Sequence, residues 1–201
     1  MEIENLSRGG FAANAYLLTA GSDAVLIDPT ATKEAVSAAL AKKGATLRAI
    51  LLTHGHFDHI LTATALRTAF GVPLLVHSQD NEMLDNGEKN ASLCFFSDAV
   101  CTAPADKTFA DGEQLTFGAI SLSVMHTPGH TKGSTTFLAD GVAFTGDTLF
   151  AEGYGRTDLF GGDTRALCAS LQALARLDGT LRIYPGHGES TSLKYAISVL
   201  Q

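Results

Sequence analysis

The sequence predicts an α/β fold in which two β-sheets are each covered by helices on one face. The first half of the chain alternates short apolar segments, typical of strands, with segments of helical period. Residues Thr108–Gly146 then form a run of hairpin-like strands, which a simple parallel sheet would not explain. A further helix, strand and helix follow. No linker rich in Pro or Ser divides the sequence, so we expect a single domain spanning residues 1–201.

The composition is that of a folded protein with an acidic balance. Apolar residues make up 45% of the 201 residues and charged residues 17%, which excludes a disordered chain. Lys and Arg number 14 against 21 for Asp and Glu, a net charge of −7, so we expect no nucleic-acid partner. The sequence has no apolar run near the ~18 residues of a membrane span and no signal-peptide pattern in Met1 to Phe11. We therefore expect a cytoplasmic protein without a membrane partner, and the sequence leaves its oligomeric state open.

The predicted strands are eight short apolar segments rich in branched residues. In chain order they are Asn14–Thr19, Ala24–Asp28, Leu47–Thr53, Pro73–His77, Ala119–His126, Gly133–Ala139, Val142–Gly146 and Leu181–Tyr184. Asp140-Gly141, between two of these segments, predicts a tight hairpin.

Three segments between the strands have helical patterns. Lys33–Lys43 has Thr32 as its N-cap and Gly44 as the glycine that ends the helix. The other two predicted helices are Asp58–Phe70 and Asp163–Leu177.

The three cysteines predict neither a disulfide framework nor a thiolate zinc site, because their number is odd and they form no C-x-x-C motif. They are Cys94, Cys101 and Cys168. We expect Cys168 in the core, since it adjoins Leu167 on the apolar face of a predicted helix. The segment Asp85–Lys107 has no clear period and is a candidate functional loop. Within it, Cys94–Phe96 could form the wall of a substrate pocket.

A cluster of histidines predicts a metal site. Of the seven histidines, three lie within six residues, in the run His54-Gly-His56-Phe-Asp58-His59. This run follows a predicted strand and opens a predicted helix. Imidazoles two residues apart can converge on one metal ion, while Asp58 and His59 point to a second position nearby.

The remaining candidate ligands also follow predicted strands. His130, Asp147 and His187 each come after a strand, with a glycine adjacent or nearly so. Ligands at several strand ends, gathered at one edge of the two sheets, describe a metal site held by a rigid frame.

These residues resemble the signature of the metallo-β-lactamase superfamily, in full and in order. The resemblance extends over nearly the whole chain, from Asn14-x-Tyr16-Leu17 to Thr127-Pro128-Gly129-His130-Thr131 and beyond. It implies a four-layer αββα sandwich with two divalent metal ions at one edge. Zinc is the expected metal, and iron and manganese are the alternatives.

By matched position, the resemblance implies three sets of ligands. Metal 1 is held by His54, His56 and His130, metal 2 by Asp58, His59 and His187, and Asp147 bridges the two. A catalytic role for Asp58 is also implied. No cysteine stands at a ligand position, which favours the hydrolase branches of the superfamily over the lactamases proper.

Gly146–Asp158 and Pro185-Gly186-His187-Gly188 are most similar to the short glyoxalase II-like hydrolases. This similarity implies hydrolysis of a thioester, S-(hydroxyacyl)glutathione in first place, to glutathione and a 2-hydroxy acid. We expect a hydroxide bridging the metals to attack the thioester carbonyl. We also expect the C-terminal helical domain of full-length glyoxalase II to be missing. Arg156 is the predicted contact for the thiol portion and Tyr154 a predicted pocket residue, although Arg156 could instead only pair with Asp158.

Other functions stay open at this point. An Fe(II)-dependent persulfide dioxygenase of the same fold would use only His54, His130 and Asp147, and also shares the segment Gly155–Asp158. That branch commonly has Cys at the position of Tyr154, which is absent here. A lactone or ester hydrolase and a purely structural metal centre are further alternatives.

Two histidines fall outside the predicted ligand sets. His77 ends a predicted strand, and we expect a structural role for it. His126 lies four residues before His130 and could orient the site or only pack.

Overall fold

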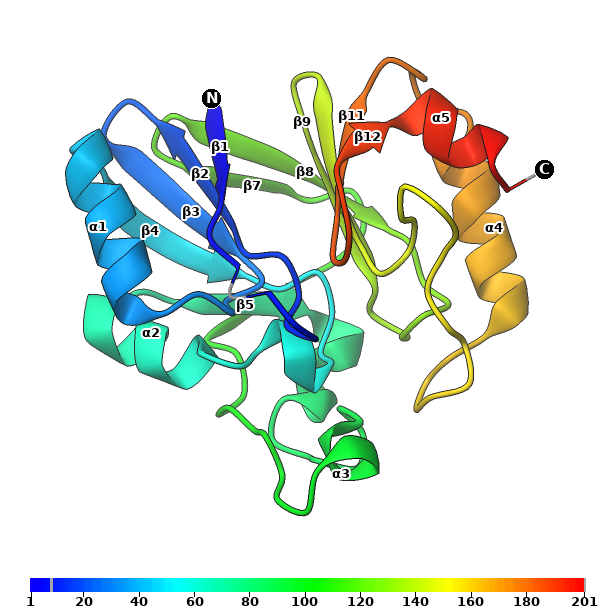
Figure 1. Cartoon of the computed structure of the whole chain (residues 1–201), viewed down its shortest axis with the longest axis horizontal. Helices are drawn as coiled ribbons and strands as arrows, with labels where there is room; N and C mark the ends of the chain where they lie inside the picture. Colours follow the sequence, from blue (N-terminus) through cyan, green and yellow to red (C-terminus); the bar gives the residue numbers. More distant parts are fainter. Residues whose placement is uncertain (8, 201) are drawn as a thin grey trace.

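The computed structural model describes residues 1–7 and 9–200, and these form two β-sheets packed face to face between two pairs of helices (Figure 1). Helices α1 (Lys33–Lys43) and α2 (Ala63–Phe70) cover the outer side of the first sheet. Helices α4 (Thr164–Leu174) and α5 (Leu193–Ser198) cover the second. The predicted α/β class and the αββα sandwich are confirmed.

Each sheet has six strands and mixes parallel with antiparallel pairs. The first sheet has the order β1-β2-β3-β4-β5-β6. Its strands are β1 (Glu2–Asn5), β2 (Tyr16–Ala20), β3 (Asp23–Ile27), β4 (Thr46–Leu51), β5 (Leu74–His77) and β6 (Lys107–Phe109).

The second sheet has the order β12-β11-β10-β9-β8-β7. Its strands are β7 (Gln114–Phe117), β8 (Ile120–His126), β9 (Thr135–Ala139), β10 (Val142–Gly146), β11 (Arg182–Pro185) and β12 (Thr191–Ser192). Each of the eight predicted strands therefore corresponds to an observed one, with shifted ends except at β10.

Three layers of buried apolar side chains hold the sandwich together. One lies under α1 and α2, one between the two sheets, and one under α4 and α5. The middle layer contains Phe109, Phe137 and Phe144, all nearly inaccessible to solvent. Burying side chains of this size contributes roughly 1.5–3 kcal/mol each, so the frame that carries the loops at the sheet edge is rigid.

Two predictions about the helices are wrong in detail. The predicted helix Asp58–Phe70 is divided into a single 3-10 turn, η1 (Phe57–His59), and the later α2, with non-helical backbone at Ile60 and Thr62. The predicted core position of Cys168 is also wrong, because that side chain is exposed. On α4 the buried positions are Leu167, Ser170 and Leu174; Cys168 is rotated about 100° from Leu167 around the axis.

The predicted loop Asp85–Lys107 contains one short helix, α3 (Ser92–Phe95), and follows the 3-10 segment η2 (Ser78–Met83). Within the described residues, no helix is long and apolar enough to cross a membrane.

Candidate metal centre

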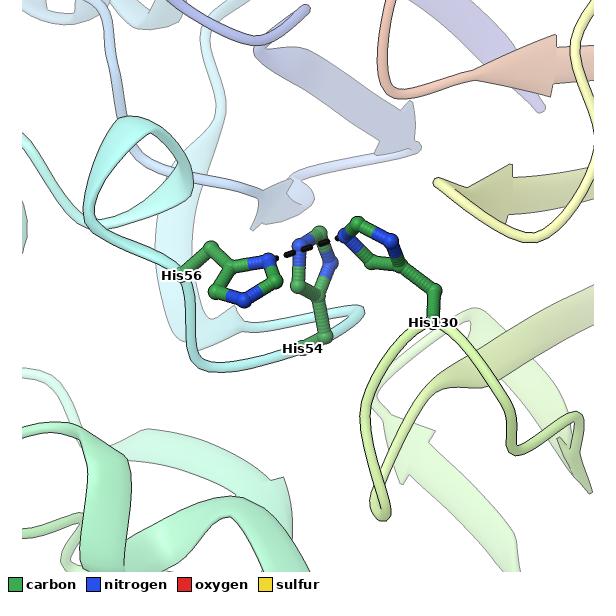
Figure 2. Close-up of side chains that lie close together, drawn as sticks. All are labelled: His54, His56 and His130. Atoms are coloured by element: carbon green, nitrogen blue, oxygen red, sulfur yellow. Dashed lines mark hydrogen bonds between the residues drawn. The ribbon is translucent and has the colours of Figure 1, made fainter. Parts of the chain in front are cut away.

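The loops that follow β4, β8, β10 and β11 meet at one edge of the sandwich and bring the seven predicted ligands together. His54, His56 and His130 form one group of possible metal ligands, in which the ligand atoms lie within 4.8 Å of one another. Figure 2 shows their three rings converging, with His56 Nδ1 2.8 Å from His130 Nε2. All three side chains are buried.

A second group forms beside the first. It contains Asp58, His59 and His187, with His187 Nε2 3.0 Å from Asp58 Oδ2. Asp147 stands between the groups: its Oδ2 lies 3.6 Å from His130 Nε2 and 3.6 Å from His187 Nε2. This placement allows one carboxylate to serve both groups, which is the bridging role predicted for Asp147.

Hydrogen bonds around the rings determine which nitrogen of each histidine is free to bind a metal ion. His130 Nδ1 donates to the backbone carbonyl of Arg156 at 2.7 Å, so its Nε2 is the nitrogen that faces the other ligands. His59 Nδ1 donates to Asp28 Oδ2 at 2.8 Å, and its Nε2 likewise faces Asp147. His54 Nδ1 lies 3.2 Å from the hydroxyl of Thr53, which itself donates to Asp28. Partners of this kind orient the ligands of metal sites.

The charges of the cluster suit a bound cation. Burial and the neighbouring imidazoles lower the pKa of His54 far below its usual range and that of His56 to about 3, so both rings are neutral. Burial also lowers the pKa of His59, but Asp28, Asp147 and Asp58 together raise it well above the usual value. Burial raises the pKa of Asp147, yet the surrounding histidines bring it far below its ordinary value. The carboxylates thus remain ionised and require positive charge beside them.

The buried polar atoms of the cluster test whether metal ions fit. Among the described residues, the buried side-chain nitrogen and oxygen atoms without a hydrogen-bond partner all belong to this cluster; they are His54 Nε2, His56 Nε2, His59 Nε2 and Asp147 Oδ1. Buried polar atoms are nearly always paired. Because imidazole and carboxylate are the donors that zinc, iron and manganese accept, the residues present fit metal ions.

Two carboxylates that the sequence analysis missed support the ligand loops. Asp28 accepts hydrogen bonds from the backbone N–H and the hydroxyl of Thr53 as well as from His59. Asp80 accepts from Gly55 N–H, Gly133 N–H and the Thr131 hydroxyl, and so joins the loop after β4 to the loop after β8. Burial raises the pKa of Asp80, and these donors offset the effect only in part. Asp28 directly follows β3, so the strand-end criterion could have found it.

The N-terminal motif Asn14-x-Tyr16 holds the loop that carries His187. Asn14 Nδ2 donates to the backbone carbonyls of Pro185 and Gly188, and the Tyr16 hydroxyl donates to that of Pro185 at 2.8 Å. In the same loop a Cβ at Gly186 would collide with Asp147 Oδ1 and lie 2.7 Å from His59 Cε1. Only glycine therefore allows this loop to approach the ligands.

A cavity of about 410 Å³ opens beside the ligands. Its lining includes the ligands His56, Asp58, His130 and Asp147, and Arg156 reaches it from the loop after β10. Arg156 also forms two hydrogen bonds with Asp158, at 2.6 and 2.8 Å, so the predicted cavity position and the alternative pairing are both present.

Some of the other predicted pocket residues lie elsewhere. Tyr154 is 55% exposed in the turn between two glycines and does not line this cavity, contrary to prediction. Of the proposed wall Cys94–Phe96, the two phenylalanines line the cavity and Cys94 does not. His77 and His126 stack on each other with ring centres 4.2 Å apart, and neither belongs to a ligand group.

Comparison with known proteins agrees with this geometry. The family model described as the metallo-beta-lactamase superfamily matches residues 8–187. A hydroxyacylglutathione hydrolase, GloC, of Haemophilus influenzae is 32% identical, and the match covers 96% of this chain and 93% of that protein.

Two solved structures are similar over nearly their whole length. One is described as the B3 metallo-beta-lactamase BLEG-1, with 35% identity, a TM-score of 0.90, and coverage of 98% of this chain and 97% of that one. The other is TTHA1623 in a di-iron-bound form, with 34% identity, a TM-score of 0.84 and 96% coverage of both chains.

Proposed function

The chain belongs to the metallo-beta-lactamase superfamily, and from this we propose that it is a binuclear metallohydrolase that cleaves thioesters, S-(hydroxyacyl)glutathione in first place. The observation that carries the proposal is the pair of ligand groups joined by Asp147. The relative named hydroxyacylglutathione hydrolase, which matches over most of both chains, supports the choice of substrate.

His54, His56 and His130 would hold one metal ion, Asp58, His59 and His187 the other, and Asp147 both. When bound, the two ions lower the pKa of water towards ~7 and polarise a carbonyl oxygen. The di-iron form of a structural relative supports a site for two metals, and zinc, iron and manganese all suit these donors.

The chain's own groups bind and orient the substrate. Asp58 and Asp147 line the cavity and remain ionised, so the free carboxylate oxygen of Asp58 can accept a hydrogen bond from water that enters there and orient it. In the overall reaction the oxygen of water bonds to the acyl carbon and the C–S bond breaks. The sulfur leaves with the bonding electrons, and a thiolate with a pKa near ~8.5 needs no strong acid to assist it. Arg156 is placed to meet a carboxylate of the thiol portion.

The alternative is an Fe(II)-dependent persulfide dioxygenase built on His54, His130 and Asp147 alone. The assembled group of Asp58, His59 and His187 favours the hydrolase, because a mononuclear site has no use for a second set of converging ligands. The similarity to a B3 metallo-beta-lactamase makes β-lactams a further substrate class to test, together with lactones and esters.

The test is a metal count combined with three assays on one preparation of the protein, purified without chelator. We expect two metal ions per chain and release of free thiol from S-lactoylglutathione, with no oxygen uptake on a persulfide and slower hydrolysis of a β-lactam. Asp147→Ala should abolish the thiol release, whereas Asp140→Asn, in the exposed turn between β9 and β10, should leave it unchanged. A single iron per chain with oxygen uptake would establish the dioxygenase instead.

A further inference from the structure

Four phenylalanine rings form one wall of the cavity beside the ligands. This aromatic wall consists of Phe11, Phe57, Phe95 and Phe96. Its rings pack edge to face or tilted, with centres 5.4–6.2 Å apart. They come from three separate parts of the chain, the segment before β2, the turn η1 and the helix α3 with the residue after it. Such convergence on one cavity is typical of a ligand site.

Three of the four rings of the wall are exposed to solvent, and that of Phe57 is buried. Phe11 is 60% exposed, Phe95 56% and Phe96 39%. Another exposed ring, that of Phe160, lies beneath the ammonium groups of Lys89 and Lys132. In the part of the chain that the structure describes, no cation covers the rings of the wall. A contiguous apolar surface next to a reactive site indicates an apolar ligand.

The charges around the cavity indicate which portion of a thioester substrate, thiol or acyl, lies on the wall. Arg156 is the one cationic side chain among the described residues that line it, and it comes from the loop after β10, not from the segments that form the wall. A thiol carrier such as glutathione has two carboxylates and an ammonium group, which would lose hydration against phenyl rings without finding partners. The charged thiol portion therefore does not lie on the wall, and the acyl portion does.

The composition of the cavity leads to the same assignment. The wall and the ligands His56, Asp58, His130 and Asp147 line one cavity of about 410 Å³. Phe57 immediately precedes Asp58 in the sequence, so the wall begins at the ligands themselves. A group on the wall must be attached close to the reacting carbonyl carbon, as the side group of an acyl chain is.

We propose that the aromatic wall selects thioesters whose acyl portion carries an uncharged aryl or branched alkyl side group. This inference rests on the proposed thioesterase function and concerns the acyl group of the substrate. The methyl side group of a lactoyl thioester is small and would leave most of the wall uncovered.

The test uses the metal-loaded protein and two series of thioesters. The first series keeps glutathione as the thiol and changes the acyl group from lactoyl to 2-hydroxyisovaleryl and to mandeloyl. The second keeps the lactoyl group and changes the thiol from glutathione to N-acetylcysteamine and to thiophenol. We expect kcat/KM in the first series to rise at least about tenfold from lactoyl to mandeloyl, the effect of filling an apolar pocket.

Variants of the wall show whether the preference arises there. Phe95→Ala and Phe96→Ala should bring the mandeloyl-to-lactoyl ratio of kcat/KM close to one. Both side chains are exposed, so these variants should fold. Tyr195→Ala is the matched control, because Tyr195 is a 46% exposed aromatic residue on α5 outside the cavity and its loss should leave the ratio unchanged.

Product binding gives a readout that does not depend on turnover. Mandelate should inhibit lactoylglutathione hydrolysis at a concentration at least about tenfold below that required of lactate, and calorimetry should show the same order of binding, lost in Phe96→Ala. Equal kcat/KM values across the acyl series, or a preference that survives both Phe variants, would overturn the inference and leave the thioesterase function intact. Failure to hydrolyse any thioester would instead reject the proposed function itself, and equal binding of the two acids would then reject the acyl wall as well.

Discussion

Asp28 Oδ2 accepts a hydrogen bond from His59 Nδ1 at 2.8 Å, and this contact fixes which nitrogen of His59 faces the metal ligands. Asp28 has a left-handed backbone conformation, with φ of 52°, and its other acceptor positions are filled by Thr53. One carboxylate thus orients the His59 ring directly and the His54 ring through the Thr53 hydroxyl. Because these two histidines belong to different ligand groups, Asp28 couples the two groups.

Asp28→Asn should weaken metal binding without unfolding the protein. Asparagine tolerates the left-handed backbone, but its amide group must direct a donor at either Thr53 or His59. The expected loss of metal affinity is roughly 10–100-fold, larger for the ion held by Asp58, His59 and His187. Titration with a competing chelator measures it. Unchanged affinity for both ions would show that Asp28 only supports the backbone.

Asp147→Ala should impair both metal positions, whereas His187→Ala should mainly weaken one. The reason is that Asp147 lies within 3.6 Å of nitrogens from both groups, while His187 belongs to the group of Asp58 and His59. Metal content measured by mass spectrometry after gel filtration separates these outcomes. Equal loss of both metals in a folded His187→Ala protein would contradict the division into two groups.

Asp80→Ala should destabilise the fold. The substitution leaves the buried N–H groups of Gly55 and Gly133 without an acceptor, at a cost of at least about 2 kcal/mol in the free energy of unfolding, while the Thr131 hydroxyl can still donate to Ser134. Asp163→Ala is the control. Asp163 is the exposed N-cap of α4 and accepts one backbone hydrogen bond, so its loss should lower the free energy of unfolding by only about 1 kcal/mol. Urea unfolding of the two variants gives the comparison. A similar loss in both would mean that Asp80 is dispensable.

Arg156→Ala should raise KM for an anionic thioester by roughly tenfold or more, about 1.4 kcal/mol, and leave a small neutral thioester nearly unaffected. Asp158→Asn is the informative partner variant. If Arg156 binds substrate, this variant releases the guanidinium and should keep or lower KM. If Arg156 only supports its loop, both variants should lower the melting temperature alike and affect both substrates equally.

His77 should make stability depend on pH below neutrality. Burial and the stacked His126 lower the pKa of His77 to about 4, although Asp111 opposes the shift. An unfolded chain binds this proton near pH 6.5 and the folded protein only near pH 4, so the folding stability contributed by His77 is complete above pH 6.5 and is lost progressively below it. His77→Gln cannot titrate. The difference in free energy of unfolding between wild type and variant should therefore be constant above pH 7 and shrink towards pH 4.5. A constant difference over this whole range would show that His77 does not titrate as stated.

The strand ends made the metal centre predictable from sequence. The run His54 to His59, together with His130, Asp147 and His187, follows β4, β8, β10 and β11, and the sandwich places these ends at one edge. Asp80 could not be found in this way, because its partners lie 25 to 53 residues away in the chain. Long-range hydrogen bonds leave no local pattern in the sequence.

The errors in the predicted elements have similar causes. The helical period over Asp58–Phe70 is interrupted because Asp58 and His59 turn towards the ligands, which tertiary contacts favour over a continuous helix. The strands that were not predicted individually, β1, β6, β7 and β12, are only two to four residues long. Segments of this length become strands through their neighbours in the sheet, and their own residues carry too little pattern.

The ligands of the centre come from opposite halves of the sandwich. His54, His56, Asp58 and His59 follow a strand of the first sheet, while His130, Asp147 and His187 follow strands of the second. A bound ion therefore cross-links the two sheets and favours the native state by mass action. At a free metal concentration one hundred times Kd, each ion adds about 2.7 kcal/mol to the stability of the protein. Metal supply would then set how long the chain survives proteolysis as well as how fast it works.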